Sequence, residues 1–258
     1  MRFLVIGDIV GRPGRKAIKQ NLSHIKQDFG IDFTIANGEN AAGGNGITRD
    51  IARELLNSGI DVITMGNHVW NKKEIYEYIE NEGRLIRPAN YPLGNPGLGM
   101  NIYNKDGVLI GVINVSGRVF MPPLDCPFRK VDELLKSLDN KVRVIIVDFH
   151  AEASSEKVAM GWYLDGRVSA VCGTHTHVQT ADERILPGGT AYITDIGMTG
   201  PRDSVIGVKK EIVLEKFITQ QPRRFEVADG LTQFNAVYID VDVETGEAKD
   251  IKRIFNVE

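Results

Sequence analysis

Short apolar runs alternate with amphipathic stretches through the first third of the chain. The runs at residues 2–7, 32–36 and 62–65 are too short for buried helices and predict strands. The stretches between them predict helices: Pro13 suits a first turn and Gly30 a helix end, and Thr48 can cap a helix that runs to about Asn57. This alternation is typical of a largely parallel sheet with helices on its faces.

The same pattern predicts a third helix after residues 62–65. Asn71 and Glu74 form an N-x-x-E capping pattern, so we expect that helix to start there.

The rest of the chain is richer in strands. The predicted elements are a hairpin of residues 99–104 and 108–115 around Lys-Asp-Gly, a helix ending near residue 138, strands at 142–149, 168–173 and 190–194, a helix between the first two of these, and a closing hairpin of 233–243 and 248–255. Roughly ten strands indicate two sheets. Because no repeat or clear linker interrupts the pattern, residues 1–258 are expected to form one domain.

Polar residues follow five of these strands at the point where each strand ends. They are Asp8, then Glu39 and Asn40, then Asn67 and His68, then His150, and finally His175 and His177. Ligands of open α/β sheets bind at the carboxyl edge of the strands, so we expect these side chains to share one site. Four of the five histidines lie in this set, whereas His24 falls within a predicted helix and is expected at the surface.

The residue types indicate a metal site. Imidazole, carboxylate and amide groups together suit a first-row transition ion such as Mn, Fe or Zn. A carboxylate has two oxygens and can bridge two cations, and Glu39, in a glycine-flanked loop, is the natural candidate. Asn40 could serve instead as a turn former, as asparagine often does in glycine-rich loops.

The order of these motifs over residues 8–177 resembles the calcineurin-like metallophosphoesterase superfamily, whose pattern runs D-x-H, G-D-x-x, G-N-H-[DE], H and G-H-x-H. The sequence departs from it in four places: at Val10, at Glu39-Asn40, at Val69 and at Thr174. With these departures, the opening G-D-I-V-G-x-P-G, the G-E-N-x-A-G-G and the G-T-H-T-H are similar to the YmdB-like branch. The resemblance implies an α/β fold, namely a four-layer αββα sandwich of the metallo-dependent phosphatase type with mixed, mostly parallel sheets.

The resemblance also implies the roles of the site residues. Two iron or manganese ions per chain are expected, held by Asp8, Glu39, Asn40, Asn67, His150, His175 and His177. Asp8 and His177 are assigned to one ion, His150 and His175 to the other, and Asn40 compensates for the histidine replaced by Val10. His68 is implied to be a general acid that binds no metal, a distinction that the residues alone do not make.

The implied activity is a phosphodiesterase acting on small nucleotide diesters, in the first place 2',3'-cyclic nucleotides and, as an extension, 3',5'-cyclic ones. In this mechanism a metal-bound hydroxide attacks phosphorus while His68 protonates the leaving oxygen. Two other functions stay open: a phosphomonoesterase or nucleotidase, and a metal-loaded regulatory protein that senses a nucleotide without turnover. An acid beside the metals favours catalysis, because a sensor needs none.

Charge and composition limit the kinds of partner and the cellular location that we expect for the protein. The net charge of −3 provides no basic field, so duplex nucleic acid is disfavoured. No apolar run approaches a membrane span or a signal segment, and Cys126 and Cys172 form no CxxC pair, so a cytoplasmic protein is expected, with homo-oligomers left open. The glycines after the first strand lack the G-x-G-x-x-G spacing of a dinucleotide site.

Two further residue types could touch substrate. Loop arginines at positions 12, 118 and 202 could bind a phosphate, although solvation is their more common role, and Phe120 and Phe128 could stack on a base or pack in the core.

Overall fold

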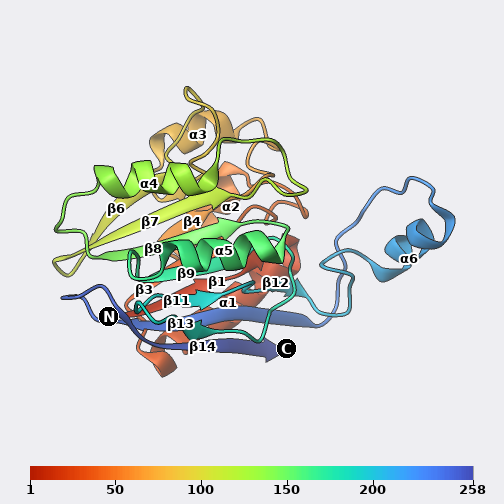
Figure 1. The fold of residues 1–258 in the computed structure, drawn as a ribbon. Helices are drawn as coiled ribbons and strands as arrows, with labels where there is room; N and C mark the ends of the chain where they lie inside the picture. The colour runs from red at the N-terminus through yellow and green to blue at the C-terminus, as the bar shows by residue number, and fades with distance from the viewer. Residues whose placement is uncertain (258) are drawn as a thin grey trace.

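The computed structural model describes residues 1–257, which form two β-sheets packed face to face (Figure 1). The first sheet has eight strands in the order β2-β12-β13-β1-β3-β4-β5, with β14 paired to β13. Its strands are β1 (Arg2–Ile6), β2 (Asp8–Ile9), β3 (Phe33–Asn37), β4 (Val62–Thr64), β5 (Leu85–Ile86), β12 (Met198–Pro201), β13 (Thr232–Val241) and β14 (Ala248–Val257).

The second sheet has six strands in the order β10-β11-β9-β8-β7-β6. They are β6 (Met100–Lys105), β7 (Val108–Ser116), β8 (Val144–His150), β9 (Ala170–Thr174), β10 (Arg184–Ile185) and β11 (Ala191–Ile193). Across both sheets, seven of the twelve pairings within residues 1–257 are parallel, so the sheets are mixed and mostly parallel, as predicted.

Helices cover the outer face of each sheet. They are α1 (Gly11–Phe29), α2 (Arg49–Asn57), α3 (Ile75–Asn81), α4 (Pro127–Ser137) and α5 (Ser154–Leu164), whereas α6 (Lys210–Thr219) lies apart from both sheets. Figure 1 shows α4 and α5 over the six-stranded sheet. The predicted ends of the first two helices are confirmed, because Gly30 adopts a left-handed φ of 60° and the Thr48 side chain accepts a hydrogen bond from the Ile51 N–H.

Three apolar clusters separate four layers. In β1, Leu4 and Ile6 pack with the helical layer of α1 to α3, while Phe3 and Val5 point the other way, into the space between the sheets. The third cluster joins the six-stranded sheet to α4 and α5. Strands buried on both faces read as continuous apolar runs, which explains why the sequence pattern located them. The predicted four-layer αββα arrangement is confirmed.

The start predicted for the third helix is wrong. Asn71 does not cap a helix: its amide lies 2.9 Å from His68 Nδ1, and the helix begins four residues later, at Ile75. The two-residue strands β2, β5 and β10, the strand β12 and the helix α6 were not predicted either. Two-residue strands are too short to show a periodic pattern, and α6 has no core to face.

The segment 202–231, called here the arm, connects the paired strands β12 and β13 and carries α6 away from the body of the protein (Figure 1). Its apolar side chains Leu214, Phe217 and Ile218 are largely exposed. Among the residues that the structure describes, no helix is long and apolar enough to cross a membrane.

Candidate metal centre

The two sheets bring the predicted ligands together from both sides. Asp8 begins β2, Glu39 and Asn40 follow β3, and Asn67 follows β4, all in the eight-stranded sheet. His150 ends β8, and His175 and His177 follow β9, in the six-stranded sheet. The site therefore lies where the carboxyl ends of parallel strands from both sheets meet.

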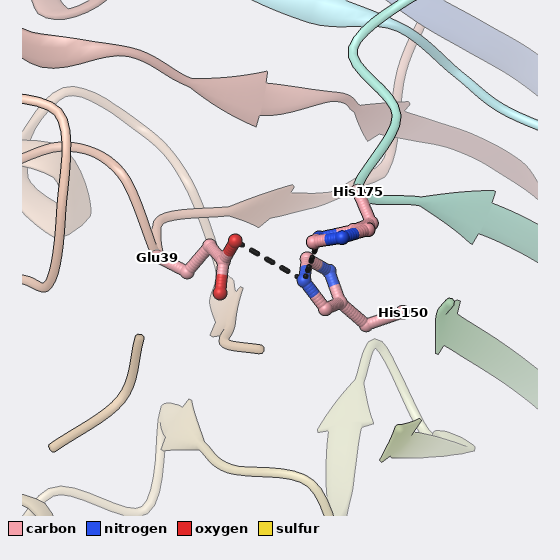
Figure 2. A group of neighbouring side chains, drawn as sticks. All are labelled: Glu39, His150 and His175. Carbon is pink, nitrogen blue, oxygen red and sulfur yellow. Dashed lines mark hydrogen bonds and ion pairs between the residues drawn. The ribbon is translucent and has the colours of Figure 1, made fainter. Parts of the chain in front are cut away.

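The tightest group consists of Glu39, His150 and His175, whose ligand atoms lie within 4.8 Å of one another (Figure 2). His150 is fully buried, and its Nε2 lies 3.1 Å from Glu39 Oε1 and 3.0 Å from His175 Nδ1. Asn67 joins this group, with its Oδ1 3.1 Å from the same nitrogen.

A second group surrounds His177. Its Nε2 lies 3.8 Å from Asp8 Oδ1 and 3.1 Å from Asn40 Nδ2. Asn40 also donates from Nδ2 to Glu39 Oε1 at 3.2 Å, so Glu39 stands between the two groups. Asp8 is fully buried; its Oδ2 accepts the His175 N–H, but its Oδ1 has no hydrogen-bond partner among the described residues.

His68 lies beside these groups rather than within them. Its backbone N–H donates to Glu39 Oε2 at 3.0 Å, while its ring Nδ1 meets the Asn71 amide. The predicted set is thus brought together in full, with the His68 side chain on its edge.

The geometry fits bound cations. One nitrogen, Nε2 of His150, faces an acceptor oxygen from each of Glu39 and Asn67 together with His175 Nδ1, and a single proton cannot serve all three. Separations near 3 Å are also those of neighbouring ligand atoms around an ion with bonds of about 2.1 Å. The chain leaves space there as well, since a Cβ on Gly66 would lie 2.3 Å from both Glu39 Oε2 and His150 Nε2.

Burial and neighbouring charges shift the pKa values of the carboxylates and histidines in this site. Burial raises the pKa of Asp8 to about 6. For Glu39, burial opposes ionisation, but the facing His150 outweighs it and lowers the pKa to about 2. Burial likewise opposes a charge on His150, yet Glu39 raises its pKa to about 9. Burial and the neighbouring His150 lower the pKa of His175 to about 3, so His175 keeps a lone pair available for a metal.

A buried ion pair fixes the loop that carries His175 and His177. Both residues adopt left-handed backbone conformations, with φ of 101° and 65°. Between them, Thr176 donates from its N–H and its hydroxyl to Asp195 Oδ2, which also accepts Lys157 Nζ at 2.6 Å. Non-glycine residues with positive φ need such support from their surroundings.

Replacement of Lys157 by methionine is expected to lower the free energy of unfolding by about 3 kcal/mol, because Asp195 would stay buried without its cation. Urea denaturation measures this. The matched control is Lys16→Met on the exposed face of α1, which should change stability by less than about 0.5 kcal/mol. Equal midpoints for the two variants would contradict the assigned role of the pair.

A buried hydrogen-bond chain, called here the relay, connects His150 through the Thr174 hydroxyl to the Asp148 carboxylate. The ring Nδ1 is 2.9 Å from Thr174 Oγ1, which donates to Asp148 Oδ1 at 2.7 Å. Burial raises the pKa of Asp148, and the carboxylate also accepts the Asn37 amide at 3.1 Å. Such contacts orient a histidine ring so that its other nitrogen faces a metal.

We therefore expect Thr174→Val, which keeps the shape and removes the hydroxyl, to weaken metal affinity about tenfold. Thr34→Val is a matched control, because Thr34 is equally buried and its hydroxyl has no partner in the described chain. Titration of metal-free protein with Mn²⁺ measures both affinities. If both variants bind the ion alike, the relay does not orient His150.

A cavity of about 300 Å³ opens onto the centre. Glu39, Asn40, His68, His175 and His177 line its polar side. Its apolar side comes from Val10 and from the base of the arm, through Ile206, Val208, Phe225 and Val227. The cavity therefore places polar groups and an apolar wall within reach of one small molecule.

Several contributors were not predicted from the sequence. Asp148 interrupts the apolar strand Val144–His150, and a lone acid inside a buried strand is a signal that could have pointed to it. Asp195 follows strand β11 as Glu39 follows β3, so the rule used for the ligands also applied to it. Lys157 lies within α5 and carried no such signal.

The structure also locates the other residues that the sequence analysis singled out. His24 lies at the surface, as predicted. Phe128 packs against Phe149 and Tyr163, and Phe120 is 90% exposed. Arg202 lines a second cavity next to the centre.

Comparison with known proteins adds sequence and fold relatives. The family model described as "YmdB-like protein" matches residues 4–254. Over 254 residues the chain is 54% identical to the 2',3'-cyclic-nucleotide 2'-phosphodiesterase of Bacillus subtilis (strain 168), covering 98% of this chain and 96% of that protein.

Solved structures extend the comparison. A crystal structure of a phosphatase from Mycoplasma pneumoniae has a TM-score of 0.95 and 38% identity, covering 100% of this chain and 93% of that one. The 5'-nucleotidase precursor of Thermus thermophilus shares the fold alone: its TM-score is 0.59 at 13% identity, over 99% of this chain and 54% of that one. The predicted fold of the metallo-dependent phosphatase type is therefore confirmed.

Proposed function

The chain belongs to the YmdB-like protein family, and from this membership we propose that it is a metal-dependent phosphodiesterase that hydrolyses 2',3'-cyclic nucleotides. The substrate class is supported by the activity for which the B. subtilis relative is named, since that relative matches nearly the whole chain. The observation that carries the chemistry is the convergence of buried carboxylate, imidazole and amide groups from both sheets onto one small cavity.

Two ions are proposed, each held from both sheets. Asp8, Asn40 and His177 would hold one, Asn67, His150 and His175 the other, and Glu39, which contacts both groups, would be shared between them. Asn40 presents its nitrogen to this group, so it would bind a cation through the opposite amide orientation. This mixed nitrogen and oxygen set suits Fe or Mn. Bound there, the ions would supply Lewis acidity that activates water and neutralises charge on the phosphoryl oxygens.

The protein's own residues supply the remaining steps. Asn71 holds the His68 ring at Nδ1, which leaves Nε2 for the substrate. The His68 ring can then protonate the alkoxide that leaves phosphorus. The apolar wall of Val208, Phe225 and Val227 fits the face of a nucleobase and excludes water from that side of the cavity.

The test is a substrate panel with protein loaded separately with Mn²⁺, Fe²⁺ and Zn²⁺. We expect turnover of 2',3'-cyclic AMP to a monoester, slow turnover of nucleotide monoesters, and loss of activity after chelation. Faster hydrolysis of monoesters than of diesters would indicate a nucleotidase instead. Tight nucleotide binding without turnover by every metal form would indicate a sensor.

A further inference from the structure

A second cavity adjoins the metal centre. Its volume is about 640 Å³, roughly twice that of the cavity over the metal ligands. His177 and Ile206 line both cavities, and His177 Nδ1 lies 2.9 Å from the Ile206 carbonyl oxygen. The two cavities therefore share a boundary at this pair of residues, so a molecule larger than one nucleotide could occupy both.

The second cavity offers cationic groups to an anion. Arg202 comes from the base of the arm and Arg253 from β14. Arg253 forms an ion pair through its Nε with Glu183 at 2.7 Å, so the other two nitrogens of its guanidinium group remain available to a ligand. Arg202 forms no ion pair with any residue in 1–257. Arginine donors in a fixed fork match phosphate oxygens.

The same cavity is lined by a residue whose amide oxygen lacks a partner. Asn235, on β13, is 1% exposed, and its Oδ1 accepts no hydrogen bond from any described residue. Buried polar atoms are nearly always paired, so an exception within a cavity points to a missing ligand donor. Phe255, which is half-exposed, adds an aromatic face at the same cavity.

We propose that this second cavity binds the neighbouring nucleotide of a short oligoribonucleotide whose 3' end carries the 2',3'-cyclic phosphate. This inference rests on the proposed function. In such a chain the ribose that carries the cyclic phosphate is joined through its 5'-oxygen to the next phosphate. With the cyclic phosphate at the metals, that second phosphate lies one ribose away, on the side of Arg202 and Arg253.

The remaining groups suit the rest of that nucleotide. Asn235 Oδ1 can accept from a hydroxyl or exocyclic amine, and Phe255 can stack on a base. A volume of about 640 Å³ accommodates one nucleotide unit. The net charge of −3 agrees with a short single strand rather than a duplex, whose binding depends on many phosphate contacts.

The experiment compares 2',3'-cyclic AMP with the dinucleotide ApA that ends in a 2',3'-cyclic phosphate. We expect kcat/KM to be about tenfold higher for the dinucleotide, mainly through KM, the size of one charge-assisted contact to phosphate. Arg202→Ala should remove this preference and leave turnover of 2',3'-cyclic AMP unchanged. The matched control is Arg224→Ala, an exposed arginine of the same arm that does not line the cavity.

The outcomes separate this inference from the proposed function. Equal kcat/KM for both substrates in the unchanged protein, or equal behaviour of the two arginine variants, would overturn the second cavity as a nucleotide site. If neither substrate is turned over, the proposed function fails. Calorimetry on Mn²⁺-loaded protein with the same dinucleotide, ApA ending in a 2',3'-cyclic phosphate, then decides the inference by itself. Weaker binding by Arg202→Ala than by Arg224→Ala would support it, and equal binding would refute it.

Discussion

Replacement of Glu39 by glutamine should reduce kcat by about 10³-fold or more and remove at least one metal ion from the purified protein. The side chain keeps its shape, but it loses the charge that lies between the two ligand groups. Two cations then repel each other without a shared anion, and several kcal/mol of charge stabilisation disappear. Elemental analysis and turnover of 2',3'-cyclic AMP measure both effects.

The control for Glu39→Gln is Glu156→Gln. Glu156 is also a buried carboxylate, but it accepts the backbone N–H groups of Arg118 and Val119 instead of facing the histidines. Its replacement should lower stability without changing the metal content. Should Glu39→Gln retain both ions and normal turnover, Glu39 is not the shared ligand.

His68→Ala is expected to slow hydrolysis of nucleotide diesters by about 10²-fold or more while metal content stays unchanged. The His68 side chain lines the cavity, whereas its backbone, which the substitution retains, holds Glu39. The loss should depend on the leaving group. A ribose hydroxyl needs a proton as its bond to phosphorus breaks, but p-nitrophenol is a good leaving group without one, so its ester should lose much less.

The comparison of the two substrates also excludes other roles. A fall in metal content would identify His68 as a ligand. Equal losses on the nucleotide and on the p-nitrophenyl ester would show that the ring positions the phosphate, and the assignment as an acid would then be withdrawn. Asn71→Ala, which frees the ring at Nδ1, should produce a smaller loss of the same pattern.

Much of the site could be predicted because the rule behind it is topological. Parallel strands share one edge, so Asp8, Glu39, Asn67, His150 and His175 were expected together as soon as the apolar runs that precede them were identified as strands. That the predicted ligands divide between two sheets was not foreseen, since strand order across sheets depends on pairings that no local pattern records. The two-sheet arrangement itself followed from the number of strands and from the family resemblance.

The supporting residues were harder to predict for a different reason. Lys157 and Asp195 act only as a pair, and 38 positions separate them in the chain. The helix start expected at Asn71 failed because that side chain contacts His68, three residues earlier in the chain, instead of a helix N-terminus. The arm likewise shows no core-facing stripe in sequence, because α6 lies away from the body and buries little.

The division of the predicted ligands between the sheets has a consequence for the thermal stability of the protein. Ions bound to both groups would cross-link the two sheets, because the sheets could separate only if the shared cations dissociated. An ion present at a thousandfold excess over its Kd adds about 4 kcal/mol to the stability of a folded chain. That is a large fraction of the roughly 5–15 kcal/mol typical of natural domains. Removal of the metal ions would then have two effects: loss of the catalytic activity and a lower free energy of unfolding.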